Sequence, residues 1–280
     1  MSNKDLLENI KKLRERTGVG FKDCKLAIDE NNGDIDKSIE FLRKKGIAKA
    51  SKKMSRTASE GLALVSEKEG EISVIEINSE TDFVAKNDDF ITFCKEISEI
   101  CLSQKGDLEK INSKEMKNNI SVKDNLIDLI AKIGEKITIR RAIFFNKNDG
   151  DNFCYVHGAI EKNIGKIVSV VKLSKSENSK EIGSKIAMHV AASNPISLDK
   201  ESLKKEILDK ELEIIKAELL NSGKKAEIVE KIALGKINKF VSDNTLLNQP
   251  WIMDPKMKVS DILKKSKVLN FIRYKVGEGV

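Results

Sequence analysis

The chain has 280 residues, of which 40% are hydrophobic and 34% charged, and its formal net charge is +7. This composition excludes a disordered chain, and the length is sufficient for two or three compact units. No apolar run approaches the ~20 residues of a membrane-spanning helix, and no signal region is evident at the N-terminus. Its cysteines (Cys24, Cys94, Cys101 and Cys154) form no Cys-x-x-Cys pair. We therefore expect a reduced, cytoplasmic protein.

The positive charge is concentrated near the N-terminus. Residues 1–57 hold 15 lysines and arginines against nine acidic residues, whereas the remaining chain is nearly balanced, with 36 against 35. Residues 46–57 contain four basic residues, no acid and no aromatic residue that would stack on a base. This pattern favours a solvated basic linker, and contact with an acidic partner stays open as the alternative.

Residues 1–45 predict a module of three short helices. Apolar residues recur at helical spacing in three runs, separated by turns at residues 16–20 and 31–33. Asp34 is the expected N-cap of the third helix, and Gly46 lies just past its expected end. Because a module of this size is near the lower limit for independent folding, we expect it to dock onto a partner and to contain no catalytic cleft.

Residues 58–150 predict the first half of an α+β core. Apolar and polar residues alternate over 62–66 and 72–77, which indicates a pair of strands, and two amphipathic helices follow. The run at 137–145 predicts a further strand.

Residues 151–198 predict a second, similar half. Residues 158–160 and 165–173 are expected to be strands that correspond to the first pair, and a helix follows them. Residues 241–280 return to this half and end in a strand at 267–276. The predicted fold class is therefore α+β, with a two-subdomain core of similar halves.

Residues 199–240 predict an antiparallel helical hairpin inserted into the second half. Apolar residues follow 4-3-4 spacing in its first arm and 3-4-4-3 spacing in its second, and residues 222–224 separate the arms. Because its other faces are charged, a self-contained arm and a homodimer contact are equally compatible with the pattern.

The most informative stretch is the turn at residues 79–87, which precedes an amphipathic helix beginning near Asp88. In this turn Asp82 lies beside Phe83, and the pair is awkward to bury because a carboxylate needs water or donors and a phenyl ring needs an apolar surface. If both point outward, they fit a partner surface with a polar groove beside a small apolar slot. The alternative is that Phe83 completes the core while Asp82 or Asp88 caps the helix.

The motifs of common enzymes are missing from the sequence. There is no phosphate-binding loop, no nucleophile elbow and no metal-ligand spacing around His157 or His189. His189 falls on the apolar side of a predicted helix, where a buried and hydrogen-bonded histidine is the expected arrangement. A binding or regulatory protein without a cofactor or metal is therefore favoured over an enzyme. An RNA- or ribosome-binding protein that uses the basic linker, and an enzyme with an unrecognised site, stay open.

The sequence resembles the elongation factor Ts family, the guanine-nucleotide exchange factors of bacterial translation, over nearly its whole length and in order. The most specific block is Thr-Asp-Phe-Val-Ala-Lys at 81–86. The other blocks are 13–18 with 23–25 and 32–35, and 187–195 followed by 249–251 and 271–279.

The resemblance implies that the partner is elongation factor Tu, in its GDP-bound and nucleotide-free forms. Phe83 would enter an apolar pocket between helices of the partner, and Asp82 would disturb the network around its magnesium ion. The residues implied in exchange are Thr81, Asp82, Phe83, Val84 and His157. This implication reverses the preference for a buried Phe83.

The resemblance also implies that residues 1–45 form a ubiquitin-associated-like module that docks through Arg14, Phe21 and Lys25, with Lys53 of the linker nearby. No membrane contact and no direct contact with nucleic acid are implied. The 199–240 hairpin corresponds to the coiled-coil insertion through which some members form homodimers.

Two departures from the family pattern concern affinity more than activity. Members commonly continue beyond residues 276–279 into a last short helix that contacts the partner, whereas this sequence stops at Val280. The segment 161–165, close to His157, is also longer than usual.

Overall fold

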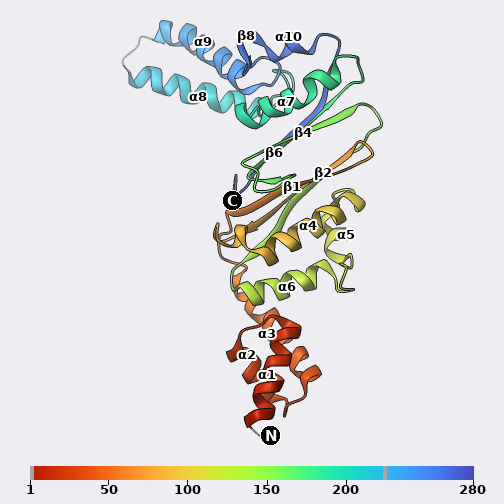
Figure 1. The fold of residues 1–280 in the computed structure, drawn as a ribbon. Coiled ribbons are helices and arrows are strands. Elements are labelled where there is room, and N and C mark those ends of the chain that lie inside the picture. Colours follow the sequence, from red (N-terminus) through yellow and green to blue (C-terminus); the bar gives the residue numbers. More distant parts are fainter. Residues whose placement is uncertain (1–2, 223–225) are drawn as a thin grey trace. The chain divides into compact units, whose positions relative to one another are not determined.

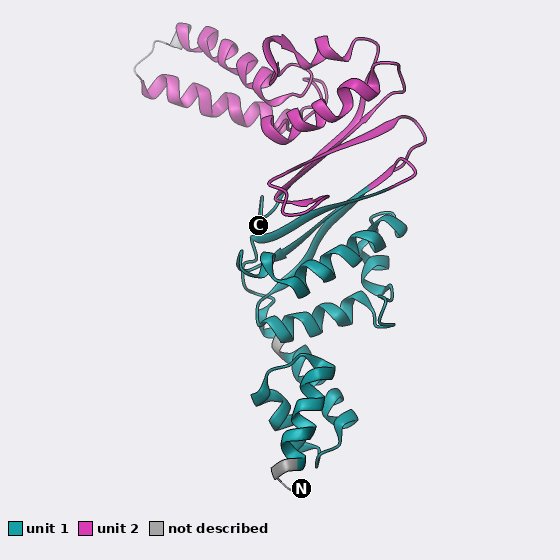
Figure 2. Cartoon of the chain, viewed as in Figure 1, with its two compact units in different colours: residues 1–67, 73–144, 275–280 teal, residues 68–72, 145–274 magenta. Residues whose placement is uncertain are grey.

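The structure is a computed structural model that describes residues 3–222 and 226–280. The chain divides into two compact units, formed by residues 1–67, 73–144 and 275–280 and by residues 68–72 and 145–274 (Figure 2). Both units combine helices with sheet strands, so the predicted α+β class is confirmed (Figure 1).

The helices and strands of the first 145 residues are α1 (Asn3–Thr17), α2 (Phe21–Glu30), α3 (Ile35–Lys53), β1 (Glu60–Lys68), β2 (Glu71–Ser79), η1 (Val84–Lys86), α4 (Asp88–Ser103), α5 (Leu108–Ser113), α6 (Val122–Ile133) and β3 (Ile137–Phe145). Those of the remaining chain are β4 (Asp151–His157), β5 (Ile164–Gly165), β6 (Ile167–Leu173), α7 (Ser179–Ser193), α8 (Lys205–Asn221), α9 (Ala226–Asn244), β7 (Pro250–Trp251), β8 (Asp254–Lys258), α10 (Val259–Leu263) and β9 (Val268–Lys275).

The N-terminal module consists of the three predicted helices, but the third continues further than expected. Asp34 caps α3 by accepting a hydrogen bond from the Lys37 backbone N–H at 2.9 Å. Gly46 does not end this helix, because it lies inside α3 and faces α6. A Cβ atom at Gly46 would stand 3.2 Å from Cβ of Ala131, so the glycine permits a close approach of the two helices. The segment predicted as a solvated linker is therefore helical up to Lys53.

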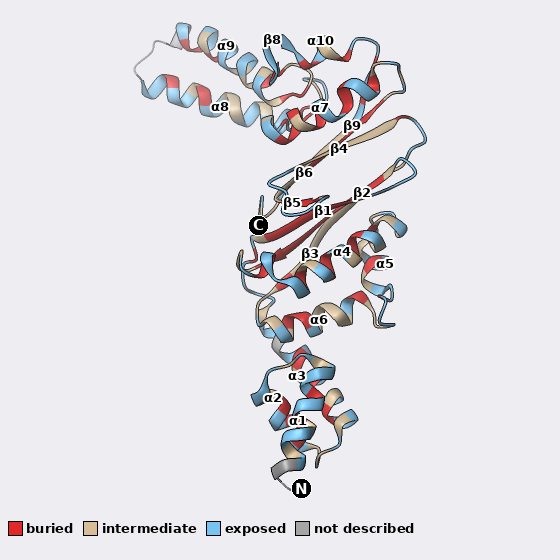
Figure 3. Ribbon diagram, in the orientation of Figure 1, coloured by how far each residue is buried: buried red, intermediate tan, exposed pale blue. Residues whose placement is uncertain are grey.

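The sheet of the first unit contains β1, β2 and β3, in the order β3-β2-β1. The β1–β2 hairpin turns at Glu69 and Gly70, which both have positive φ, 53° and 82°, as a tight two-residue hairpin turn requires. Every residue of β2 after Glu71 is buried (Figure 3). Polar side chains on this strand, such as Glu76, therefore need partners inside the protein.

The second unit contains a sheet in the order β4-β6-β9, with α7 packed against it. β4 pairs antiparallel with β6, from Asp151 opposite Leu173 to His157 opposite Ile167. The expectation of a strand at 158–160 is wrong, because the first strand of this half is β4. Gly158 has φ 62° and ends β4, and the following residues form a tight turn in which the Ile160 N–H donates to the Ile164 carbonyl at 3.0 Å.

The helical hairpin consists of α8 and α9, which enclose a small apolar core of their own. Its buried members are Ile215, Leu219, Val229 and Ala233. The hairpin begins at Lys205, later than predicted, and its second arm continues to Asn244. Of the predicted separator, residues 223–224 lie outside the described residues.

His189 on α7 is buried, and its role as a structural residue is confirmed. Its Nδ1 accepts the Ile252 N–H at 3.4 Å, which leaves Nε2 to carry the proton and donate to Oε1 of Gln249 at 2.9 Å. The ring also stacks on Trp251, with ring centroids 5.3 Å apart. Burial lowers the pKa of His189, although the Gln249 hydrogen bond opposes that shift, so the neutral form is favoured here.

Candidate partner-binding site at the end of strand β2

Phe83 lies on the surface, four residues after the end of β2, and it is 79% exposed. No other large hydrophobic side chain in the described part of the chain is as exposed. The next two residues, Val84 and Ala85, begin η1 and are buried. The turn is thus anchored by its small apolar residues while its largest one stands in solvent, and the alternative of a core Phe83 is wrong.

Asp82 is also accessible, and its carboxylate pairs with Nζ of Lys86 one helical turn later at 2.8 Å. The helix that follows is capped by Asn87, whose side-chain oxygen accepts the Phe90 N–H at 3.2 Å. The alternative that Asp82 or Asp88 caps this helix is therefore wrong. Asp82 and Phe83 together present a carboxylate and a phenyl ring at the surface.

A second loop, between α6 and β3, holds the residues just before Asp82. Oε2 of Glu135 accepts the Thr81 N–H at 3.0 Å, and Oε1 accepts the Thr81 hydroxyl at 2.8 Å. In the opposite direction, the Glu80 carboxylate accepts the Lys136 N–H at 2.5 Å. Arg56 adds a contact from Nη1 to both oxygens of Glu80, at 3.3 Å.

The sequence analysis did not predict these contacts of the α6–β3 loop. Glu135 lies 54 positions after Thr81, so no local spacing connects them. The one signal was Gly134, a left-handed residue with φ 87° that ends α6 and turns the chain.

The contacts between the two loops also determine the ionisation of Glu80. Burial by itself raises the pKa of the Glu80 carboxyl, but hydrogen bonds from the Lys136 N–H and from Arg56 outweigh that effect and hold the pKa below its usual value. Glu80 is therefore ionised near neutral pH and accepts these hydrogen bonds as a carboxylate.

His157 ends β4 in the second compact unit, and its side chain is exposed. Its Nδ1 lies 3.4 Å from the hydroxyl of Tyr155, two residues earlier on the same strand. The other four residues predicted for exchange, Thr81–Val84, belong to the first unit.

The residues predicted for docking of the N-terminal module fall into two groups. Arg14, Phe21 and Lys25 are exposed on α1 and α2, and the Phe21 ring is 47% exposed. Lys53, by contrast, donates from Nζ to the Gly134 carbonyl and is engaged within the chain.

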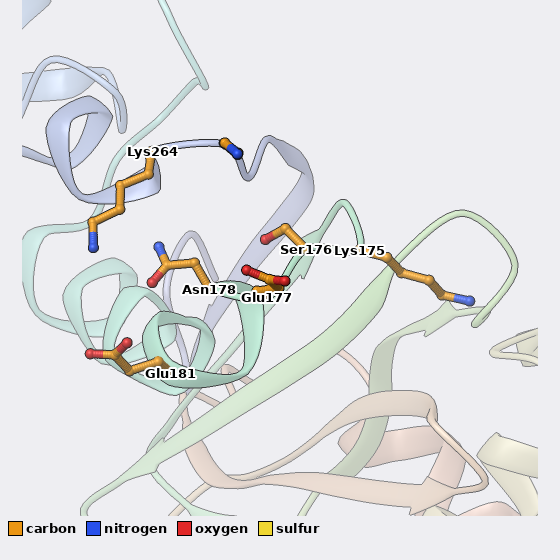
Figure 4. Close-up of a pocket in the computed structure, with 7 residues that line it drawn as sticks. Lys175, Ser176, Glu177, Asn178, Glu181 and Lys264 are labelled. Atoms are coloured by element: carbon orange, nitrogen blue, oxygen red, sulfur yellow. The ribbon is translucent and has the colours of Figure 1, made fainter.

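Among the described residues, no group of three or more His, Cys, Asp or Glu side chains is placed to hold a metal ion, and no described helix has the length and apolarity to cross a membrane. A surface pocket of about 640 Å³ in the second unit lies at the start of α7 (Figure 4). Its lining residues are Lys175, Ser176, Glu177, Asn178, Glu181, Lys264 and Lys265. The lining carries both charge signs, on three lysines and two glutamates, and none of the predicted site residues is among them.

Comparison with known proteins agrees with the resemblance of the sequence. The family model for "Elongation factor TS" matches residues 80–278. Elongation factor Ts of Methylococcus capsulatus is 41% identical over 276 residues, which cover 97% of this chain and 92% of that protein. The chain belongs to the elongation factor Ts family. Membership of the elongation factor Ts family makes it a translation elongation factor, and the matched region begins at Glu80, in the turn that carries Asp82 and Phe83.

Proposed function

We propose that this protein binds elongation factor Tu and accelerates the release of GDP from it. The observation that carries the proposal is the 79% exposure of Phe83 beside the accessible carboxylate of Asp82. An exposed phenyl ring on an anchored turn gains free energy only when a partner covers it, and complete burial contributes about 1.5–3 kcal/mol. The turn is therefore suited to enter a partner and displace groups already there.

The two side chains perform different parts of the exchange. Phe83 enters an apolar pocket between helices of elongation factor Tu, and this burial stabilises the complex. Asp82 brings a negative charge toward the magnesium ion and the diphosphate, and the loss of magnesium contacts weakens GDP binding because the ion is the largest local charge. Lys86 partly neutralises Asp82 in the free protein, at 2.8 Å. His157 contributes a second contact, with the domain of elongation factor Tu that Phe83 enters.

Coupling between the two ligands is reciprocal. If the exchange factor weakens GDP binding by a given factor, GDP weakens binding of the exchange factor by the same factor. The proposed exchange makes and breaks no covalent bond, so it requires neither a cofactor nor a metal ion of this protein's own.

The N-terminal module supplies additional affinity through Arg14, Phe21 and Lys25. Its position on the first unit is defined by α3, which packs on α6 through Gly46 and an ion pair between Arg43 and Asp124 at 2.7 Å. A partner protein thus meets a docking surface that is attached to the core by a helix. We place this function in the cytoplasm, where translation takes place.

Release of labelled GDP from purified elongation factor Tu tests the proposal. We expect acceleration at substoichiometric amounts of this protein, and a clear loss of that acceleration in Phe83→Ala. Absence of acceleration, combined with retention on RNA that weakens steeply with salt, would contradict exchange and support the RNA-binding alternative.

A further inference from the structure

Two loops of the first unit exchange carboxylate and backbone groups. Glu135 accepts the N–H and the hydroxyl of Thr81, at 3.0 and 2.8 Å. Glu80, next to Thr81, accepts the N–H of Lys136, next to Glu135, at 2.5 Å. Each loop therefore provides one carboxylate and one backbone donor, and each carboxylate satisfies a donor in the other loop.

These hydrogen bonds lie just beyond the end of β2, where backbone pairing with a neighbouring strand stops. β2 ends at Ser79, so the N–H of Thr81 has no partner in a neighbouring strand. Within the turn, the Ser79 hydroxyl donates to the Thr81 carbonyl at 2.9 Å, which uses the acceptor but not the donor of Thr81. Glu135 supplies the missing acceptor, and its second oxygen fixes the Thr81 side chain as well.

A carboxylate is suited to this position. Its two oxygens accept two donors at once, and hydrogen bonds to an ionised acceptor are about twice as strong as neutral ones. A glutamine would keep one acceptor and direct an amide donor toward a donor of Thr81. An alanine would leave both Thr81 donors to solvent.

We propose that Glu135 is a positioning residue for exchange, which holds the Asp82–Phe83 turn in the orientation that enters the partner. This inference rests on the proposed function. Phe83 follows Thr81 by only two residues, so the backbone fixed at Thr81 limits where the phenyl ring stands. A turn released at Thr81 samples other orientations. Because the N-terminal module still docks onto the partner, complexes also form in which Phe83 is misplaced, and only a fraction of the bound complexes is then productive.

Residues at and just after the end of α3 also form hydrogen bonds with these two loops. Nη1 of Arg56 contacts both oxygens of Glu80 at 3.3 Å, and Nζ of Lys136 donates to the Arg56 carbonyl at 2.7 Å. Lys53 donates to the carbonyl of Gly134, next to Glu135. Lys53 and Arg56, at and just after the end of α3, are therefore bonded to both loops, beside the contacts that Glu135 makes with Thr81.

The first measurement uses the free protein and does not depend on GDP release from a partner. Amide hydrogen exchange over residues 80–87 should be faster in Glu135→Ala than in the wild type. Glu99→Ala, which removes an exposed carboxylate of α4 in the same unit, is the matched control and should leave these amides unchanged. Unchanged protection in Glu135→Ala would overturn the proposal.

The second measurement is a double-mutant cycle on GDP release from elongation factor Tu. Glu135→Ala should lower the maximal rate about tenfold, while the concentration of factor at half-maximal acceleration changes little. Because Glu135 acts through the turn, the same substitution in a Phe83→Ala background should have almost no further effect. Thr81→Val should reproduce part of the loss in maximal rate. Thr81→Ser, which keeps the hydroxyl, should retain the wild-type maximal rate.

The outcomes separate this inference from the proposed function. Losses that multiply in the Phe83→Ala, Glu135→Ala double variant, or a change in half-maximal concentration alone, would overturn the positioning role while exchange itself stands. If the wild type does not accelerate GDP release, the proposed function fails, and a role of Glu135 in exchange fails with it. The amide measurement then shows separately whether Glu135 holds the turn.

Discussion

The carboxylate of Glu76, completely buried on β2, receives a hydrogen bond from Nε of Arg141 on the neighbouring strand β3 at 2.6 Å. Nη1 of Arg140 binds the other oxygen at 3.0 Å, and the backbone N–H of Gly277 reaches the same oxygen at 2.9 Å. The C-terminal residues 275–280 are thereby attached to the centre of the first unit.

The environment of Glu76 favours its charged form. Burial alone raises its pKa, but hydrogen bonds from the Gly277 N–H, Asn78 and Arg141 outweigh burial and hold the pKa below its usual value. A buried carboxylate with this many donors is stable only while its partners are present.

Glu76→Gln should destabilise the protein strongly. The substitution removes the negative charge that two partly buried arginines share, and disruption of a buried ion pair typically costs about 3–5 kcal/mol. Chemical denaturation measures this difference in the free energy of unfolding. Glu67→Gln, at an exposed position of β1, is the control, and an equal small effect of both variants would contradict the role assigned to Glu76.

Phe83→Ala should fold as the wild type does and lose much of its exchange activity. The ring is exposed, so its removal leaves no cavity and the melting temperature should change little. In the complex, the lost burial should cost about 2–3 kcal/mol. A large drop in melting temperature, with normal GDP release by the folded fraction, would show that Phe83 belongs to the core instead.

We expect glycine-to-alanine substitutions at two helical positions to change the stability of the protein in opposite directions. A Cβ at Gly183 on α7 would stand 2.2 Å from Cγ of Phe153, so Gly183→Ala forces a displacement and should cost about 1–3 kcal/mol. Gly235 on α9 has nothing within 4 Å of its Cβ position, and Gly235→Ala should stabilise by about 0.5–1 kcal/mol. Thermal unfolding of both variants checks the signs, and the prediction fails if the signs agree.

Stability should decrease as the pH falls below the ordinary pKa of histidine, about 6.5. His189 has a lowered pKa in the folded protein because it is buried, so the unfolded chain takes up its proton first as the pH falls. The stabilisation is present above the unfolded pKa and is lost as the pH approaches the folded pKa.

The comparison of denaturation at several pH values identifies the responsible histidine. In His189→Gln, the part of the pH dependence between about pH 7 and 5 should be reduced. His157→Gln, which removes the exposed histidine at the end of β4, should retain the wild-type dependence. A reduction in His157→Gln alone would contradict the assignment.

Local patterns were sufficient to predict most individual elements. Asp34 and the following apolar spacing predicted the start of α3, and the run at 137–145 predicted β3 with the bounds that are observed. Errors arose where a glycine had two uses. Gly46 resembled a helix end but permits contact with Ala131. Gly158 was assigned to a strand at 158–160, whereas it follows and ends β4.

The sequence by itself determined the α+β class, the family and the identity of the turn that carries Asp82 and Phe83. These follow from residue spacing and from one specific motif, which are local properties of the chain. Only the tertiary structure decided that Phe83 is exposed and that Glu135 holds Thr81. Both depend on which distant segments cover or contact the turn, and a hydrogen bond across 54 positions has no counterpart in local periodicity.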